Sequence, residues 1–220
     1  MKTSDRNKQG PHAMGTRSAA VLLAALLASS LVVAGGCKST KPLPTLQDSM
    51  TQVAQRRSEA IRLTDQAFKA QQAGKLDRAD ELYRQALTLD GSISAAWNNL
   101  GELLLSQGFY QDAVQAFGEA AALSPADPRP EYNIAVAYQK SGWAKDALEH
   151  FGYALDRDPN YRPAIRGGIK AAAELGTASR DIHSWIRQGL LNETDEAWRS
   201  FFEQQRFRVE AALEDELRNG

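Results

Sequence analysis

The sequence predicts an all-α protein built as a solenoid of helix–turn–helix repeats and closed by a C-terminal helix. Gly74, Gly108 and Gly142 lie 34 residues apart. An alanine and an aromatic residue recur with the same period, at Ala79, Ala113 and Ala147 and at Tyr83, Phe117 and Phe151. The apolar residues around them are spaced three and four apart, which is the period of a helix face. A period of this length indicates pairs of helices that bury their apolar faces only by stacking on neighbouring pairs.

The expected helices follow from this period, and together they give a solenoid over residues 46–192. A first helix begins at Leu46, where Thr45 is a candidate cap with Asp48 three residues later, and it can continue into the first repeat. The glycine of each mid-repeat turn ends one helix, and Pro125 and Pro159 end the next. The repeats span 60–93, 94–127, 128–161 and 162–192, with helices expected near 60–73, 76–89, 94–107, 110–123, 128–141, 144–157, 162–175 and 178–190.

The two ends of the solenoid depart from the pattern, as terminal repeats do. In the fourth repeat Asp181 falls on the alanine position and Trp185 on the aromatic position, so this repeat is degenerate. Residues 193–220 form an amphipathic helix, expected near 193–218, that caps the open end of the core. Its apolar face comprises Trp198, Phe201, Phe202, Val209, Leu213 and Leu217.

The period and the residue types resemble the tetratricopeptide repeat (TPR) family. The family pattern W-x2-L-G-x2-Y, A-x3-F, A and P is followed in the second repeat by Trp97, Leu100, Gly101, Leu104, Ala113, Phe117, Ala120 and Pro125. The resemblance implies a right-handed α-solenoid that works as a binding scaffold. It also implies that the first helix of each repeat lines a concave groove.

The N-terminal 36 residues read as an export signal. Basic residues precede an uncharged, apolar stretch from Ser18 to Gly36. The stretch ends Ala34-Gly35-Gly36-Cys37, which resembles the lipobox of bacterial lipoproteins. Most lipoboxes have leucine three places before the cysteine, where this sequence has Ala34. The resemblance implies lipidation of Cys37 and cleavage before it. An uncleaved membrane anchor is the alternative, because 19 residues of helix span roughly 28 Å.

Both interpretations place the rest of the chain outside the cytoplasm. Residues 37–45 then form a flexible tether, because Pro42 and Pro44 disfavour regular structure. Lys38 after the cysteine favours the outer over the inner membrane by the same resemblance. Translation can begin at Met1 or at Met14, because either start leaves a complete signal.

Composition argues against several other functions. Beyond residue 36 the chain carries 22 basic and 26 acidic residues, so it lacks the basic stripe of a nucleic-acid binder. Cys37 is the sole cysteine, and the histidines stand alone, which argues against a metal site. His150 is expected on a solvated face. No catalytic constellation is recognisable, so we expect neither an enzyme nor a cofactor.

The resemblance places a peptide-binding groove on ten residues. They are Asn98, Asn99, Glu102, Arg129, Tyr132, Asn133, Gln139, Lys140, Arg166 and Lys170. Arg129, Arg166 and Lys170 make the C-terminal half of this groove positive, which suits an acidic segment or a terminal carboxylate. The carboxylate clamp of chaperone-binding members needs lysine and asparagine in the first repeat, where this sequence has Thr64 and Phe68.

The anchor and the solenoid together predict a membrane-held scaffold of the bacterial cell envelope. Its partners would be other envelope proteins, in the assembly of pilus, secretion or outer-membrane machinery. The alternative function is an accessory regulator that docks a cell-wall enzyme.

Overall fold

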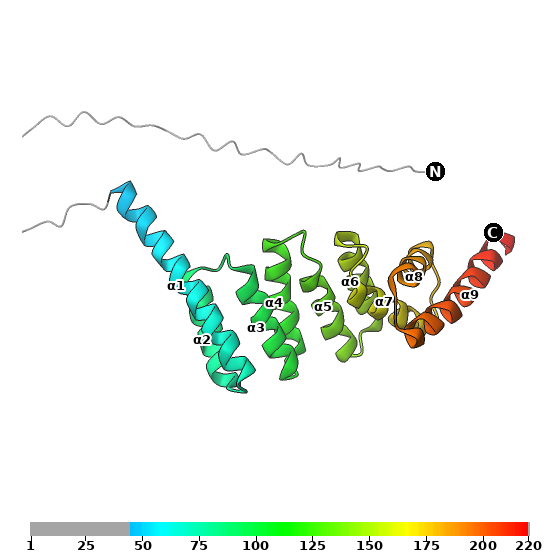
Figure 1. Cartoon of the computed structure of the whole chain (residues 1–220), viewed down its shortest axis with the longest axis horizontal. Coiled ribbons are helices and arrows are strands. Elements are labelled where there is room, and N and C mark those ends of the chain that lie inside the picture. The colour runs from blue at the N-terminus through cyan, green and yellow to red at the C-terminus, as the bar shows by residue number, and fades with distance from the viewer. Residues whose placement is uncertain (1–44, 220) are drawn as a thin grey trace, which may run out of the picture. The chain divides into compact units, whose positions relative to one another are not determined.

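A computed structural model describes residues 45–219, and their regular structure is entirely α-helical. The helices are stacked in chain order along the length of this part of the chain (Figure 1). The predicted all-α solenoid is confirmed. The export signal, Cys37 and most of the tether lie outside the described residues. The helices are α1 (Leu46–Gln72), α2 (Leu76–Leu89), α3 (Ser94–Ser106), α4 (Tyr110–Leu123), α5 (Arg129–Lys140), α6 (Ala144–Arg157), α7 (Arg162–Leu175), α8 (Arg180–Asn192) and α9 (Glu196–Asn219).

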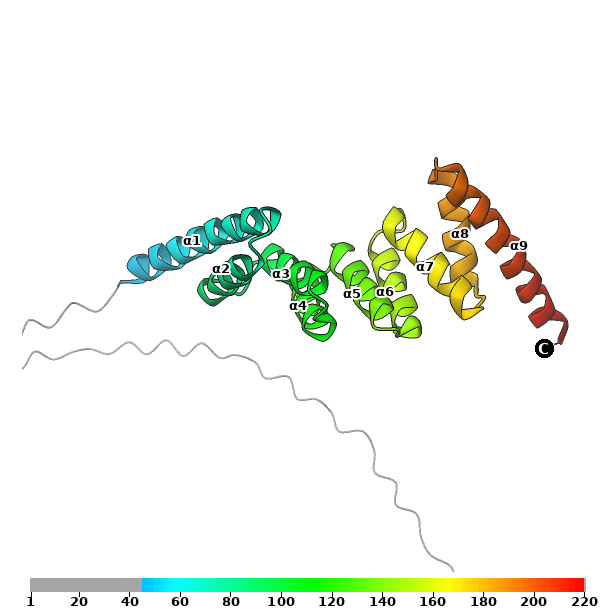
Figure 2. The same ribbon diagram turned by 90° about the horizontal axis from the view of Figure 1, so that it is seen from below.

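The helices pair as the repeat predicts, and the pairs stack into a curved row (Figure 2). α1 packs on α2, α3 on α4, α5 on α6, and α7 on α8. The first helices α1, α3, α5 and α7 also contact each other in succession. Between the second helices α2, α4, α6 and α8 there is no close backbone approach. A row with its first helices in contact and its second helices splayed is curved with the first helices on the inner, concave side.

Glycines make the turns and the closest helix contacts possible. Gly74, Gly108, Gly142 and Gly176 have φ values of 73°, 86°, 81° and 68°, and each lies in the turn between the helices of one repeat. This left-handed conformation costs glycine little and other residues more. Within α3, a Cβ at Gly101 would lie 2.6 Å from ring atoms of Phe117. The fully buried Phe117 ring therefore packs directly on the α3 backbone.

The fourth repeat departs from the pattern mainly in the length of its turn, and its core positions are still held by apolar residues. α8 begins four residues after Gly176, whereas α6 begins two residues after Gly142. The longer turn shifts the register by one residue. Ile182 and Ile186 are buried, 35 residues after Ala147 and Phe151, while Asp181 is exposed. The expectation that Asp181 and Trp185 hold the alanine and aromatic positions is therefore wrong, because the longer turn moves the core register of α8 by one residue.

The long terminal helices cover the two ends of the solenoid. α1 begins with the predicted capping box: the Thr45 hydroxyl accepts from the Asp48 amide at 3.1 Å, and Asp48 accepts from the Thr45 amide at 3.0 Å. α1 runs without interruption into the first repeat, and its first turns are exposed. α9 packs on α7 and α8 through the buried side chains of Phe202 and Val209. Within residues 45–219, no helix combines the length and the apolar character needed to cross a membrane.

Candidate binding groove

A cavity of about 330 Å³ lies on the concave side, between α5, α7 and the start of α9. Four of the ten predicted groove residues line it: Tyr132, Gln139, Arg166 and Lys170. Its volume lies within the range of sites that take a small ligand or a few side chains. The remaining lining residues are Val136, Phe151, Arg162, Pro163, Gly167 and Trp198.

Aromatic rings form one wall of this cavity. The ring of Tyr132 lies 5.9 Å from that of Phe151 and meets Tyr161 edge-on at 5.6 Å. Burial raises the pKa of Tyr132, so its hydroxyl stays protonated at neutral pH. At Gly167 a Cβ would collide with the Phe151 ring, so glycine keeps this part of the wall close to the backbone. The wall offers apolar area with one polar tip.

The guanidinium of Arg166 is held between a carboxylate and an indole. Its Nε donates to Glu193 Oε2 at 2.7 Å, and its Cζ lies 4.8 Å from the centre of the Trp198 ring. The Glu193 side chain is 1% exposed, and its other oxygen accepts from the amides of Thr194 and Asp195 at 3.0 Å each. The Arg166 hydrogen bond lowers the pKa of Glu193 to about 2. Arg166 thus links α7 to the segment that begins α9, and its charge is compensated.

The other predicted cations differ in how freely they face solvent. Arg129 forms a two-pronged pair with Asp127, with N–O distances of 2.7 to 3.1 Å. The Nζ of Lys170 is 3.9 Å from Glu174, a separation that contributes little at a surface. Lys140 is exposed and makes no ion pair within the described residues. The positive charge open to a ligand therefore comes from Lys140 and Lys170 more than from Arg129 and Arg166.

Arg162 adds a cation that the sequence reasoning did not select. Its Nη2 donates to the backbone carbonyl of Asn192 at 3.2 Å, and it lines the cavity together with Arg166 and Lys170. Among the described residues that line this cavity, none is acidic. A negative group that enters it would meet cations from α7 and aromatic rings from α5, α6 and α9.

The N-terminal half of the predicted groove is a hydrogen-bonded polar network. Asn98 donates to Glu102 at 2.8 Å, and Asn133 donates to the carbonyl oxygen of Asn98 at 3.1 Å. These bonds join α3 to α5, so the three side chains partly satisfy one another. Asn99 is half-buried beside them. Burial, and next the carboxylate of Glu102, raise the pKa of Tyr83 to about 12, so this hydroxyl remains neutral as well.

The register of His150 predicts a solvated face, but the structure does not place it on one. Its Nδ1 is 2.6 Å from Glu131 Oε2, and Arg157 binds the other oxygen of Glu131 at 2.7 Å. Burial lowers the pKa of His150, so the neutral imidazole is favoured near pH 7. The outward register was right, but the buried Glu131 on α5 draws the ring inward. Within residues 45–219 no cluster of three or more His, Cys, Asp and Glu side chains could hold a metal ion.

Comparison with known proteins agrees with this geometry. Residues 64–128 match the family model described as tetratricopeptide repeat. The peroxisomal targeting signal receptor of Kluyveromyces lactis is 29% identical over 114 residues, which cover 51% of this chain and 20% of the receptor. The match thus spans about a fifth of that relative's length.

Two solved structures show the same fold at low sequence identity. A crystal structure of MamA has a TM-score of 0.58 at 14% identity and covers 71% of this chain and 87% of its own. The first TPR of Spaghetti, bound to the HSP90 peptide SRMEEVD, has a TM-score of 0.52 at 18% identity and covers 55% of this chain and 95% of its own. The helices of this chain therefore have the fold of a helical repeat solenoid, and residues 64–128 within it match the tetratricopeptide repeat.

Proposed function

We propose that this protein is a binding scaffold, not an enzyme, which is held at a bacterial envelope membrane by a lipid on Cys37 and captures an acidic segment of a partner protein. The observation that carries the binding role is the concave cavity of about 330 Å³, whose charged lining residues, among those described, are all cations. An acidic side chain there would pair with Arg162 or Lys170, while an apolar neighbour would pack on Tyr132 or Trp198.

A structural relative supports a peptide as the ligand. The TPR of Spaghetti binds the peptide SRMEEVD, which carries three acidic residues. At 18% identity that likeness shows only the fold, from which we infer that a solenoid of this kind can hold an acidic peptide. The present chain would hold its peptide differently, because Thr64 is buried and Phe68 is 45% exposed in the first repeat. We therefore propose that recognition is concentrated between α5, α7 and α9.

The membrane anchor rests on the sequence of the export signal. The uncharged stretch from Ser18 to Gly36 is followed at once by Cys37, and α1 begins nine residues later. Nine extended residues reach at most about 30 Å, so a lipid on Cys37 would hold the solenoid close to the membrane. Such tethering raises the local concentration of the scaffold relative to other envelope proteins. Intact mass of the mature protein tests the lipid directly.

The binding role is tested by charge reversal of cations that, within the described residues, make no ion pair closer than the 3.9 Å between Lys170 and Glu174. Arg162 donates only to the backbone carbonyl of Asn192. We expect the triple variant Lys140→Glu, Arg162→Glu and Lys170→Glu to lose its cross-linked envelope partner. Arg166 is left unchanged, because reversing it would set two carboxylates against each other beside Trp198. The matched control reverses Arg56, Lys69 and Lys75, which are exposed near the other end. Retention of the partner by the groove variant would refute the groove, whereas loss of the partner by both variants would show nonspecific charge attraction.

The identity of the captured partner separates the two functions considered. A component of an assembly or secretion machine supports the scaffold, and a cell-wall hydrolase or synthase supports the accessory regulator. The identity is read by mass spectrometry of the cross-linked product.

A further inference from the structure

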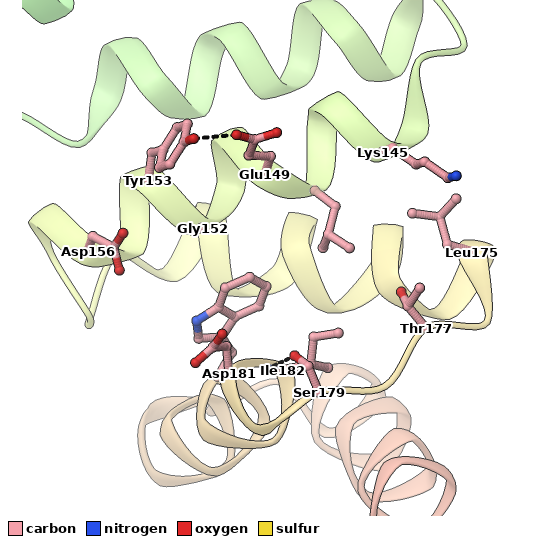
Figure 3. Close-up of a pocket in the computed structure, with 12 residues that line it drawn as sticks. Lys145, Glu149, Gly152, Tyr153, Asp156, Leu175, Thr177, Ser179, Asp181 and Ile182 are labelled. Carbon is pink, nitrogen blue, oxygen red and sulfur yellow. Dashed lines mark hydrogen bonds between the residues drawn. The ribbon is translucent and has the colours of Figure 1, made fainter. Parts of the chain in front are cut away.

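The convex face carries a second cavity, in the furrow between α6 and α8. Its volume is about 480 Å³, larger than that of the groove cavity. α6 and α8 do not approach each other closely, so the furrow is open to solvent. Figure 3 shows Glu149, Tyr153 and Asp156 on one side of it and Ser179 and Asp181 on the other. The furrow is also lined by Lys145, Leu148, Gly152, Leu175, Thr177, Ile182 and Trp185.

The shifted register of the fourth repeat shapes the floor of this furrow. The indole of Trp185 lies 3.4 Å from where a Cβ of Gly152 would be, and 3.2 Å from that of Gly168. Two glycines, one on α6 and one on α7, therefore make room for the ring. Because Ile186 fills the core position, Trp185 is displaced toward the furrow and lines it.

The charge of the furrow is negative. Glu149, Asp156 and Asp181 contribute three carboxylates and Lys145 one ammonium group, which leaves a net charge near −2. Tyr153 donates to Glu149, and neither Asp156 nor Asp181 makes an ion pair within residues 45–219. An aromatic floor beneath unpaired carboxylates is the setting in which a guanidinium or an ammonium group is stabilised.

The corresponding furrow between α2 and α4 provides an internal comparison. It measures about 340 Å³ and is lined by Asp77, Asp80 and Asp112, but it has no tryptophan in its lining. Here Arg84 occupies the position that Gly152 holds 68 residues later, and its Nε donates to Asp80 at 2.8 Å. In the acidic furrow between α2 and α4, a cation of the chain itself thus already pairs with a carboxylate. The acidic furrow between α6 and α8 has no such cation at the equivalent position.

We propose that the furrow between α6 and α8 is a docking site for a lysine or arginine side chain of a protein partner. The aliphatic stem would lie against Trp185 and Leu148, and the charged end would reach the carboxylates of Asp156 and Asp181. The site is on the opposite side of the solenoid from the groove and is independent of it. The scaffold would then hold an acidic segment on its concave face and a basic segment on its convex face.

The experiment titrates the full chain, labelled with ¹⁵N-tryptophan in detergent, with N-acetyl-arginine methylamide. The four tryptophans give four indole signals, and that of Trp185 is assigned by its loss in Trp185→Phe. We expect the Trp185 signal to shift with the arginine probe. The isosteric but neutral N-acetyl-citrulline methylamide should bind at least about threefold more weakly, because it lacks the charge. Equal shifts from both probes, or no shift at Trp185, would overturn the proposal.

Variants locate the site. Asp156→Asn with Asp181→Asn should weaken the arginine probe roughly threefold to tenfold. Gly152→Arg places a cation where Arg84 lies in the first repeat, and it should abolish the shift. The matched control, Asp77→Asn with Asp112→Asn, removes two charges from the filled furrow and should bind as the wild type does. Equal weakening by the control pair would show bulk electrostatic attraction and contradict a built site.

Discussion

Glu193→Gln is expected to lower the stability of the C-terminal end of the solenoid and to raise the affinity of the groove for an acidic peptide. The Glu193 side chain is 1% exposed and accepts from Arg166 at 2.7 Å. Its pKa is lowered from 4.5 to about 2, mainly by that hydrogen bond. One pKa unit corresponds to about 1.4 kcal/mol, so the ionised carboxylate stabilises the fold by at most about 3.5 kcal/mol near pH 7. Glutamine has the same shape but only one acceptor oxygen, so it cannot accept both from Arg166 and from the amides of Thr194 and Asp195, and we expect most of this free energy to be lost.

The pH dependence follows from the direction of the shift. Because the pKa is lower in the folded state, the stabilisation is present above pH 4.5 and is lost as pH falls toward 2. At pH 3.5 the unfolded chain binds this proton and the folded chain does not. The difference in unfolding free energy between the wild type and Glu193→Gln should therefore shrink by about 1.4 kcal/mol between pH 7 and pH 3.5. Urea unfolding followed by circular dichroism at both pH values measures it.

The same variant should bind an acidic peptide more tightly, because the charge of Arg166 is no longer compensated. Glu174→Gln is the matched control: it is also a carboxylate beside a groove cation, but it is 49% exposed and 3.9 Å from Lys170. It should change stability by less than about 0.5 kcal/mol. Equal stability of Glu193→Gln and the wild type at pH 7, or a difference that does not vary with pH, would refute this account of the Arg166–Glu193 pair.

Two further predictions test the packing of the repeats. Gly101→Ala should destabilise the protein by about 1–3 kcal/mol, because its Cβ would lie 2.6 Å from Phe117. Gly118→Ala should instead stabilise α4 by about 0.5–1 kcal/mol, because nothing lies near its Cβ. Thermal melting of the two variants distinguishes the effect of a steric clash from that of helix propensity. Ile186→Ala should cost about 2–5 kcal/mol while Asp181→Ala changes stability by less than about 0.5 kcal/mol. If Asp181→Ala destabilised the protein more than Ile186→Ala in urea unfolding, α8 would follow the unshifted 34-residue register.

Features that depend on the period could be predicted from the sequence. The left-handed turn at Gly142, the close contact at Gly101 and the continuous first helix all follow from local residue types and a 34-residue spacing. The same register placed Tyr132 and Gln139 on the concave side, where the structure has them beside one cavity. Val136 and Gly167 belong to the same register and could have been selected too, but apolar and small residues carried no chemical signal of binding.

The contact of the last helix with the groove could not be predicted, although its capping role could. Trp198 and Glu193 reach the groove only because α9 folds back on α7, and no local pattern fixes that contact. The sequence therefore gave no sign that the charge of Arg166 is compensated, because its partner Glu193 lies 27 residues away. The turn after Gly176 is a similar case: α8 begins two residues later than the pattern gives, the core register shifts by one residue, and Ile182 takes the core position expected for Asp181. A fixed spacing cannot reveal where an insertion breaks it.

We propose that the concave groove between α5, α7 and α9 holds a segment of a partner protein. The most direct test is a photo-cross-linking residue placed at Gln139, which lines the groove cavity, and separately at Gln115, which is exposed on α4. We predict a discrete protein adduct from position 139 in intact cells, joined through a peptide rich in Asp and Glu, and none from position 115. No adduct at 139, or the same adduct from both positions, would show that the groove does not hold the partner.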